Sequence, residues 1–150
     1  MLNNLRYNWP QYLGLALSAY ALHVEFNKPS TVLCDLTIPF IDVKATCSKT
    51  LSSAPSHLLS YLGVVRKGSP IHMDPPNALL GVFFYLALIF LDFGSRLRRP
   101  LVLTAGITSV YLLTILYRTG DVCVLCLATH LINARLLWRQ EIGGGRIKID

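Results

Sequence analysis

Charged residues are scarce in this sequence: they make up 15% of its 150 residues, whereas hydrophobic residues make up 53% and the mean hydropathy is +0.47. A typical soluble domain carries about 25% charged residues. Internal repeats, low-complexity tracts and a shift in composition that would mark a second domain are also lacking. These absences exclude a soluble globular domain, and they predict a single integral membrane domain.

Acidic residues are fewer than basic ones, which gives a formal net charge of +6. Such an excess would suit a nucleic-acid partner. The basic residues, however, lie at the ends of apolar runs, where they set membrane topology. We therefore expect contact with membrane lipid and none with nucleic acid.

Cysteine is also rare, with four residues in the chain. Cys123 and Cys126 have the spacing of half a zinc site. Cys34 and Cys47 lie much further apart than the gap of about two to four residues that the other half requires. No metal site and no bound cofactor are expected.

Four apolar segments are predicted to cross the membrane as helices. They lie at about residues 9–26, 77–93, 101–117 and 122–138, and they approach the roughly 20 residues that a bilayer requires. Arg96, Arg98 and Arg99 lie with Pro100 between the second and third segments, which makes that turn basic and therefore cytosolic. The first segment is either a retained helix or a signal peptide cleaved near Ala19-Tyr20-Ala21.

The predicted fold is an all-α bundle of four transmembrane helices with both termini in the cytosol. Residues 28–76 form a long loop outside the cytosol, and residues 139–150 form a cytosolic tail. Within the loop, His57–Val65 has the pattern of a short amphipathic helix at the membrane interface. All four cysteines then fall on the oxidising side of the membrane, where disulfides are permitted.

The fourth segment begins with Cys123-Val124-Leu125-Cys126. Two thiols at this spacing can close a reversible disulfide, and a helix N-terminus, here capped by Thr119 and Asp121, favours the reactive thiolate. Inside a membrane span, such a redox pair would meet apolar partners that accept electrons, and a lipid quinone is the obvious one. The alternative is a pair of buried structural thiols.

Further polar residues follow on the same side of this helix. Cys123, Cys126, His130 and Asn133 fall within an arc of about 80°. Polar side chains within a span face the bundle interior or a cavity, so this stripe should point inward. His130 suits two roles equally, a hydrogen bond to a substrate or a hydrogen bond between helices.

The second segment presents a matching face. Its members, related by spacings of three and four, are Asn77, Leu80, Gly81, Phe84 and Tyr85. Gly81 permits close approach of a helix, Asn77 can donate a hydrogen bond at the outer end, and the two aromatics offer flat surfaces. Core packing is the simpler role for both aromatics, and Asn77 also suits a helix N-cap after two prolines.

Cys34 and Cys47 allow two interpretations. They form a disulfide within the loop, or one of them attacks the Cys123–Cys126 disulfide and carries electrons from a soluble partner. The sequence favours neither.

The chain resembles the vitamin K epoxide reductase family over essentially its whole length after the first helix. The residues that carry the resemblance are Cys34-Asp35, Cys47-Ser48-Lys49 with Ser52-Ser53, Asn77-(x)3-Gly81-(x)2-Phe84-Tyr85 and Asp121-Val122-Cys123-Val124-Leu125-Cys126. The resemblance implies a four-helix bundle around a quinone pocket in the endoplasmic reticulum membrane, with a lumenal loop over the pocket. It departs at His130, where vertebrate members carry a tyrosine.

The resemblance also implies a role for each cysteine. Cys126 would be the thiolate that acts on a bound vitamin K quinone or its 2,3-epoxide, and Cys123 would be its resolving partner. Cys47 would exchange with Cys123. Cys34 would pair with Cys47 and receive electrons from a lumenal thioredoxin-like oxidoreductase.

For the substrate, the resemblance implies that Asn77 hydrogen-bonds a quinone carbonyl and that Phe84 packs on the ring. The remaining residues of the expected substrate-binding set are Ser53, Leu80, Gly81, Tyr85 and His130. Quinone enters this scheme as a substrate.

The predicted function is thiol-dependent reduction of vitamin K 2,3-epoxide to the quinone and of the quinone to the hydroquinone. The same residues would serve a quinone-linked oxidoreductase that forms disulfides in lumenal thiol proteins. A non-catalytic four-helix membrane adaptor with structural disulfides is the alternative of another class. That alternative predicts that replacing Cys126 lowers stability and changes no turnover.

Overall fold

The body of the protein is helical, in agreement with the expected all-α fold. The computed structural model describes residues 2–27, 37–38, 43–44, 50, 57–66, 73–91, 96–120 and 123–144. The long helices are α1 (Leu2–Asn27), α4 (Asn77–Phe90), α5 (Arg98–Thr119) and α6 (Val124–Gly144). Between α1 and α4 lie β1 (Thr37–Ile38), β2 (Val43–Lys44) and the short helix α3 (Leu58–Tyr61).

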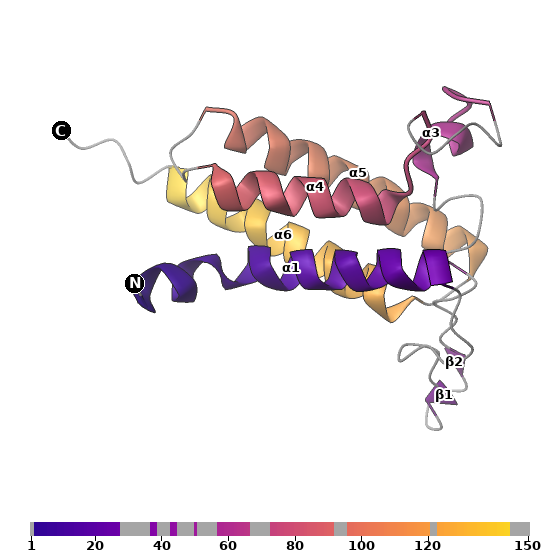
Figure 1. Ribbon diagram of the computed structural model, residues 1–150, viewed down its shortest axis with the longest axis horizontal. Coiled ribbons are helices and arrows are strands. Elements are labelled where there is room, and N and C mark those ends of the chain that lie inside the picture. The colour runs from indigo at the N-terminus through magenta and orange to yellow at the C-terminus, as the bar shows by residue number, and fades with distance from the viewer. Residues whose placement is uncertain are drawn as a thin grey trace.

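The long helices run up and down alongside one another (Figure 1). α1 packs on α4 and α6, and α5 packs on α6. The start of α1, the end of α4, the start of α5 and the end of α6 lie at one end of the bundle, whereas α3 and the β1–β2 ladder lie at the other. The sequence predicts the same grouping of segments, because each apolar helix reverses the direction of the chain.

Some boundaries differ from the predicted ones. α4 ends at Phe90 rather than 93, and α6 continues to Gly144, into the segment expected as a tail. The helix expected over His57–Val65 covers only Leu58–Tyr61, because the chain turns at Gly63, whose φ of +74° lies in the left-handed region. The antiparallel ladder of β1 and β2 is an element that the sequence pattern did not predict.

The start of α4 corrects a second expectation. Pro76 is the N-cap residue, and its carbonyl accepts a hydrogen bond from the Leu79 amide at 2.9 Å. Asn77 is therefore the first helical residue and not the cap.

Small residues bring α1 and α4 close together. Gly14 lies against the ring of Tyr85, so that a Cβ at position 14 would overlap the ring, and a Cβ at Gly81 would lie 2.7 Å from Oγ of Ser18. Gly14 and Ser18 are four residues apart, which is the small-xxx-small spacing of close helix pairs in membranes. The predicted role of Gly81 in close helix approach is thus confirmed.

Replacing Gly14 with valine should lower the free energy of unfolding by about 2 kcal/mol, because overpacking forces buried neighbours to move. Tyr85 cannot yield easily, since it is only 1% exposed and its hydroxyl donates a hydrogen bond to Asn133 Oδ1 at 2.8 Å. Unfolding in detergent, followed by circular dichroism, measures the loss. Ala16→Val adds a similar volume on an exposed part of α1 and should change stability by less than about 0.5 kcal/mol. Equal stability of the two variants would contradict this packing.

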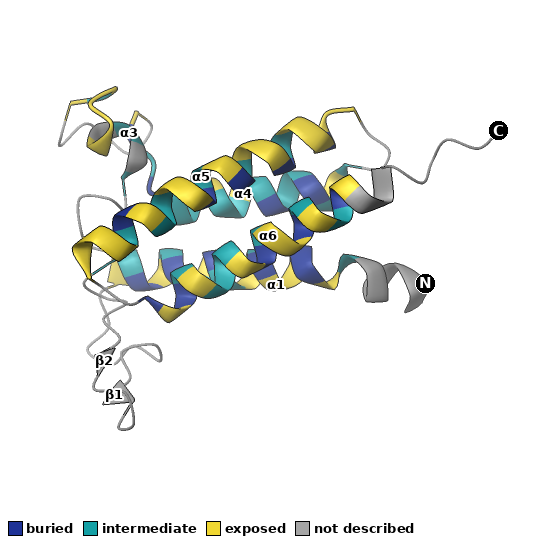
Figure 2. Ribbon diagram, turned by 180° about the vertical axis from the view of Figure 1, so that it is seen from behind, coloured by how far each residue is buried: buried dark blue, intermediate teal, exposed yellow. Residues whose placement is uncertain are grey.

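Exposed residues lie on the outward faces of the long helices (Figure 2), and many of them are large and apolar. Exposed examples, at least one from each long helix, are Trp9, Leu13, Phe83, Phe90, Ile107, Val110, Leu131 and Trp138. Among the described residues, α5 alone is both long and apolar enough to cross a membrane, with a mean hydropathy of 1.7 in its best window. α4 is apolar as well, but it has only 14 residues.

Candidate functional site

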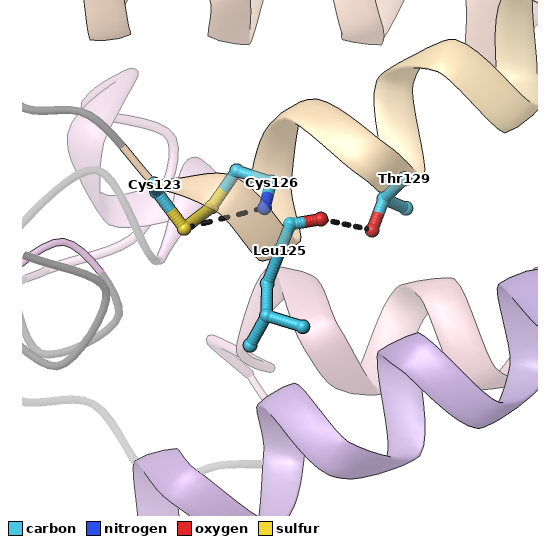
Figure 3. The surroundings of a disulfide bond; sticks show 4 residues. All are labelled: Cys123, Leu125, Cys126 and Thr129. Carbon is cyan, nitrogen blue, oxygen red and sulfur yellow. Dashed lines mark hydrogen bonds between the residues drawn. A yellow bond between two sulfur atoms is a disulfide. The ribbon is translucent and has the colours of Figure 1, made fainter. Parts of the chain in front are cut away.

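Cys123 caps the start of α6. Its sulfur accepts a hydrogen bond from the Cys126 amide at 3.2 Å (Figure 3). Its carbonyl accepts one from the Leu127 amide at 2.9 Å. These are the bonds that an N-cap residue makes. The expected cap by Thr119 is wrong, because Thr119 ends α5 and its hydroxyl bonds to the Leu116 carbonyl at 3.1 Å. Asp121, the other expected cap, lies outside the described residues.

Cys123 and Cys126 form a disulfide, with their Cα atoms 5.2 Å apart. The two sulfurs differ in their surroundings. Cys123 is 0% exposed and packs with Ala21, Val24 and Leu125 in a buried cluster. Cys126 is half-buried and lines a cavity, so it is the member of the pair that a bound molecule would meet.

A cavity of about 520 Å³ lies between the four long helices. We call it the central cavity. Its volume falls within the range of sites for small molecules, and such sites are mainly apolar with a few placed polar groups. The predicted site residues that line it are Asn77, Leu80, Gly81, Phe84, Tyr85, Cys126 and His130, and Asn133 of the polar stripe predicted to point inward lines it as well. Two segments that are distant in sequence, the start of α4 and the start of α6, therefore face one space.

Other predicted site residues are placed elsewhere or not described. Cys123 lies behind Cys126 and is not part of the cavity wall. Cys34, Cys47 and Ser53 lie outside the described residues, so their predicted roles stay predictions.

A chain of hydrogen bonds joins three helices beside the central cavity. Tyr85 on α4 donates to Asn133 Oδ1 on α6 at 2.8 Å, and Asn133 Nδ2 donates to Ser109 Oγ on α5 at 2.8 Å. The hydroxyl of Tyr85 and the amide of Asn133 are thereby engaged in holding the bundle together. Core packing is confirmed for Tyr85, whereas Phe84 is half-buried with its ring edge-on to Tyr85 at 5.1 Å between centroids.

His130 differs from Asn133 in having a polar atom without a partner. Its Nδ1 is buried and makes no hydrogen bond to the described residues. A buried polar atom left without a hydrogen bond costs about 1–3 kcal/mol, and native proteins rarely tolerate it without a reason. Because His130 lines the central cavity, a bound molecule with a polar atom at this depth would satisfy it.

The sequence reasoning missed the contribution of α5 and α1. Cavity-lining polar residues on these helices are Ser18, Glu25, Thr104, Thr108, Ser109 and Thr119. On α5 a signal existed, since Thr104 and Thr108 are four residues apart within an uncharged, mainly apolar span and so share a face. Glu25 is not part of any comparable spacing of polar residues in the sequence.

Comparison with known proteins places the chain in a family. The model of the "Vitamin K epoxide reductase family" matches residues 11–140. The chain is 31% identical over 134 residues to vitamin K epoxide reductase complex subunit 1 of Rattus norvegicus, which covers 83% of this chain and 80% of the relative. The Mus musculus protein of the same name is 31% identical over 136 residues, with the same coverage.

Proposed function

The chain belongs to the vitamin K epoxide reductase family, and on that premise we propose that it reduces vitamin K 2,3-epoxide to the quinone and the quinone to the hydroquinone. Electrons come from the Cys123–Cys126 dithiol, which becomes a disulfide. The observation that carries the proposal is that Cys126 lines the same cavity as Asn77, Phe84 and His130. A sulfur nucleophile, hydrogen-bonding groups and an aromatic ring thus surround one space.

The cysteine pair and the predicted substrate-binding residues of the central cavity each have a role in this proposal. Cys126 attacks as the thiolate, and Cys123, held directly behind it, resolves the adduct by forming the disulfide. Asn77 donates a hydrogen bond to a carbonyl oxygen of the substrate, and this bond strengthens as negative charge develops there. His130 supplies a second polar contact, and Phe84 packs on the ring while Leu80, Gly81 and Tyr85 complete the wall.

We propose further that the bundle lies in the endoplasmic reticulum membrane with both termini in the cytosol. Support comes from the large apolar side chains on the outward faces of the long helices, which water would not tolerate as a continuous surface. The spans are those predicted at about 9–26, 77–93, 101–117 and 122–138. Cys47 and Cys34 relay electrons from a lumenal thioredoxin-like oxidoreductase, and no resident cofactor takes part.

The test is an assay of the detergent-solubilised protein with dithiothreitol and either vitamin K 2,3-epoxide or vitamin K quinone. We expect both substrates to be reduced. Failure to reduce the epoxide, or failure to reduce the quinone, would overturn the proposal.

Asn77→Leu should lower kcat/KM in the same assay by about 100-fold, because one hydrogen-bond donor to a developing oxyanion is worth about 10²–10³. Asn27→Leu is the matched control. Asn27 is exposed at the end of α1, where its amide bonds to His23 Nδ1 at 2.9 Å, and it does not line the central cavity. Its replacement should leave turnover unchanged, and equal activity of the two variants would remove Asn77 from the site.

A further inference from the structure

A histidine joins two carboxylates at the end of the bundle where the cysteine pair lies. Nε2 of His57 is 3.4 Å from Glu25 Oε1, and Nδ1 of His57 is 3.6 Å from Asp74 Oδ2 and 3.0 Å from the Asp74 carbonyl. Glu25 comes from α1, His57 precedes α3 and Asp74 precedes α4. No local sequence pattern indicates this group, because its members lie far apart along the polypeptide. We call it the Glu25–His57–Asp74 chain.

The Glu25–His57–Asp74 chain connects solvent with the central cavity. The side chain of His57 is 38% exposed, whereas those of Glu25 and Asp74 are 10% and 6% exposed. Glu25 is also part of the cavity wall, as is Asn77. Gly14 faces Tyr85 and Ser18 faces Gly81, and continuing this antiparallel register along α1 places Glu25 about one helical turn past the level of Asn77.

The hydrogen bonds of His57 fix where its protons lie. A carbonyl oxygen only accepts hydrogen bonds, so Nδ1 must carry hydrogen toward Asp74. Nε2 then faces Oε1 of Glu25 at 3.4 Å. The Glu25–His57–Asp74 chain is not arranged for a metal ion, since its two carboxylates flank opposite nitrogens of the imidazole ring. The described residues also hold no cluster of three metal-binding side chains.

The proposed reduction needs such a proton path. A quinone gains two electrons and two protons on becoming a hydroquinone, and the dithiol loses two of each on becoming a disulfide, so the sum balances without a further reactant. A Cys126 thiolate, however, has already given its proton to solvent. That proton must return to the substrate oxygen from an acid in the cavity wall.

We propose that Glu25 is that acid and that His57 reloads it from lumenal water. In this step the Glu25 O–H bond breaks, an O–H bond forms on a quinone oxygen, and His57 Nε2–H then restores the carboxyl proton. Asp74 holds the ring so that Nε2 faces Glu25, and His57 and Asp74 thus act through Glu25. The inference rests on the function proposed above and adds a catalytic residue to it.

Glu25→Gln tests the acid with little change of shape. With dithiothreitol and vitamin K quinone we expect the rate of hydroquinone formation to fall about 100-fold, the lower end of what general acid catalysis contributes. Reduction of the Cys123–Cys126 disulfide by dithiothreitol, followed by maleimide labelling, should keep its wild-type rate. Glu141→Gln is the matched control, because Glu141 pairs with exposed Arg99 at 3.4 Å at the opposite end of the bundle and should retain full activity.

Chemical rescue distinguishes the role of Glu25 as an acid from a purely structural role. In Glu25→Ala, added formic acid should restore part of the lost rate, since it supplies a small acid but cannot tether α1 to His57. In His57→Gln, the first turnover should keep its rate while later turnovers slow, because Glu25 regains its proton slowly.

The outcomes separate this inference from the proposed function. Wild-type activity in Glu25→Gln, or a rate in Glu25→Ala that formic acid does not raise, would overturn the role of Glu25 and leave the reductase proposal standing. A wild-type protein that reduces neither quinone nor epoxide would overturn both.

Discussion

Replacing Cys126 with alanine should abolish the proposed reductase activity and leave the fold intact. Cys126 is the sulfur that lines the central cavity, whereas Cys123 is fully buried behind it. Without the attacking sulfur neither the adduct with the substrate nor the disulfide can form. We expect turnover with dithiothreitol to fall by about a thousandfold or more, as happens when one member of a catalytic unit is removed.

The stability of Cys126→Ala should be measured in reductant, where the wild-type disulfide is open as well. The side chain is only half-buried, so its truncation should lower the free energy of unfolding by no more than about 1 kcal/mol. A variant that loses stability but keeps full turnover would instead indicate a non-catalytic adaptor with structural disulfides.

Cys123→Ser provides the matched variant. A serine hydroxyl can still accept the hydrogen bond that the Cys123 sulfur takes from the Cys126 amide, since serine is a good N-cap residue. This variant should therefore fold as well as the wild type while losing turnover to a similar extent. Retained catalysis in Cys123→Ser would contradict the dithiol mechanism.

Arg98→Met should produce the largest loss of stability that we expect from a single replacement in this chain. Arg98 is 4% exposed, and its Nη1 donates hydrogen bonds to the carbonyls of Leu88 and Leu91, both at 3.0 Å, at the C-terminal end of α4. Gln11 on α1 accepts a further hydrogen bond from Nη2 once its amide is oriented to suit its neighbours. One guanidinium thus joins α1, α4 and α5.

The expected loss is about 4 kcal/mol, since each hydrogen bond from a charged donor is worth about 1.5–3 kcal/mol and methionine replaces none of them. Helix C-termini also favour a positive charge, so Arg98→Lys should recover part of the loss. Thermal unfolding in detergent gives the measurement.

Arg99→Met is the control for Arg98→Met. Arg99 is the next residue, but its side chain is 64% exposed and forms an ion pair with Glu141 at 3.4 Å. Exposed ion pairs contribute little, so this variant should lose less than about 1 kcal/mol. If the Arg98 and Arg99 variants unfolded alike, the buried hydrogen bonds of Arg98 would contribute nothing to stability.

The helices were predictable because their signals are local. The change from apolar runs to Arg96–Pro100 indicated where α4 gives way to α5, and the apolar run that begins at Cys123-Val124-Leu125-Cys126 placed the cysteine pair at the start of the last helix. The spacing of three and four along α4 also identified a face, from Asn77 to Tyr85, that the structure shows lining one cavity. Periodicity along a helix is enough to predict which residues share a face.

The helix-cap predictions were wrong because capping depends on the backbone conformation of neighbouring residues. Asn77 and Thr119 both had the chemistry of a cap, yet Pro76 and the sulfur of Cys123 hold those positions. Capping depends on which residue adopts non-helical dihedral angles, and composition does not settle this within one or two residues.

The sequence by itself determined the helical architecture, the place of the Cys123–Cys126 pair and the family, because apolar runs and short motifs lie in consecutive residues. Only the tertiary structure decided which cysteine faces the cavity and which polar residues meet one another. Tyr85, Asn133 and Ser109 come together from three helices, and Glu25, His57 and Asp74 from three separate segments. Contacts of this kind depend on the rotation and register of packed helices, which are set by buried groups such as Gly14 and Arg98 and not by any local pattern.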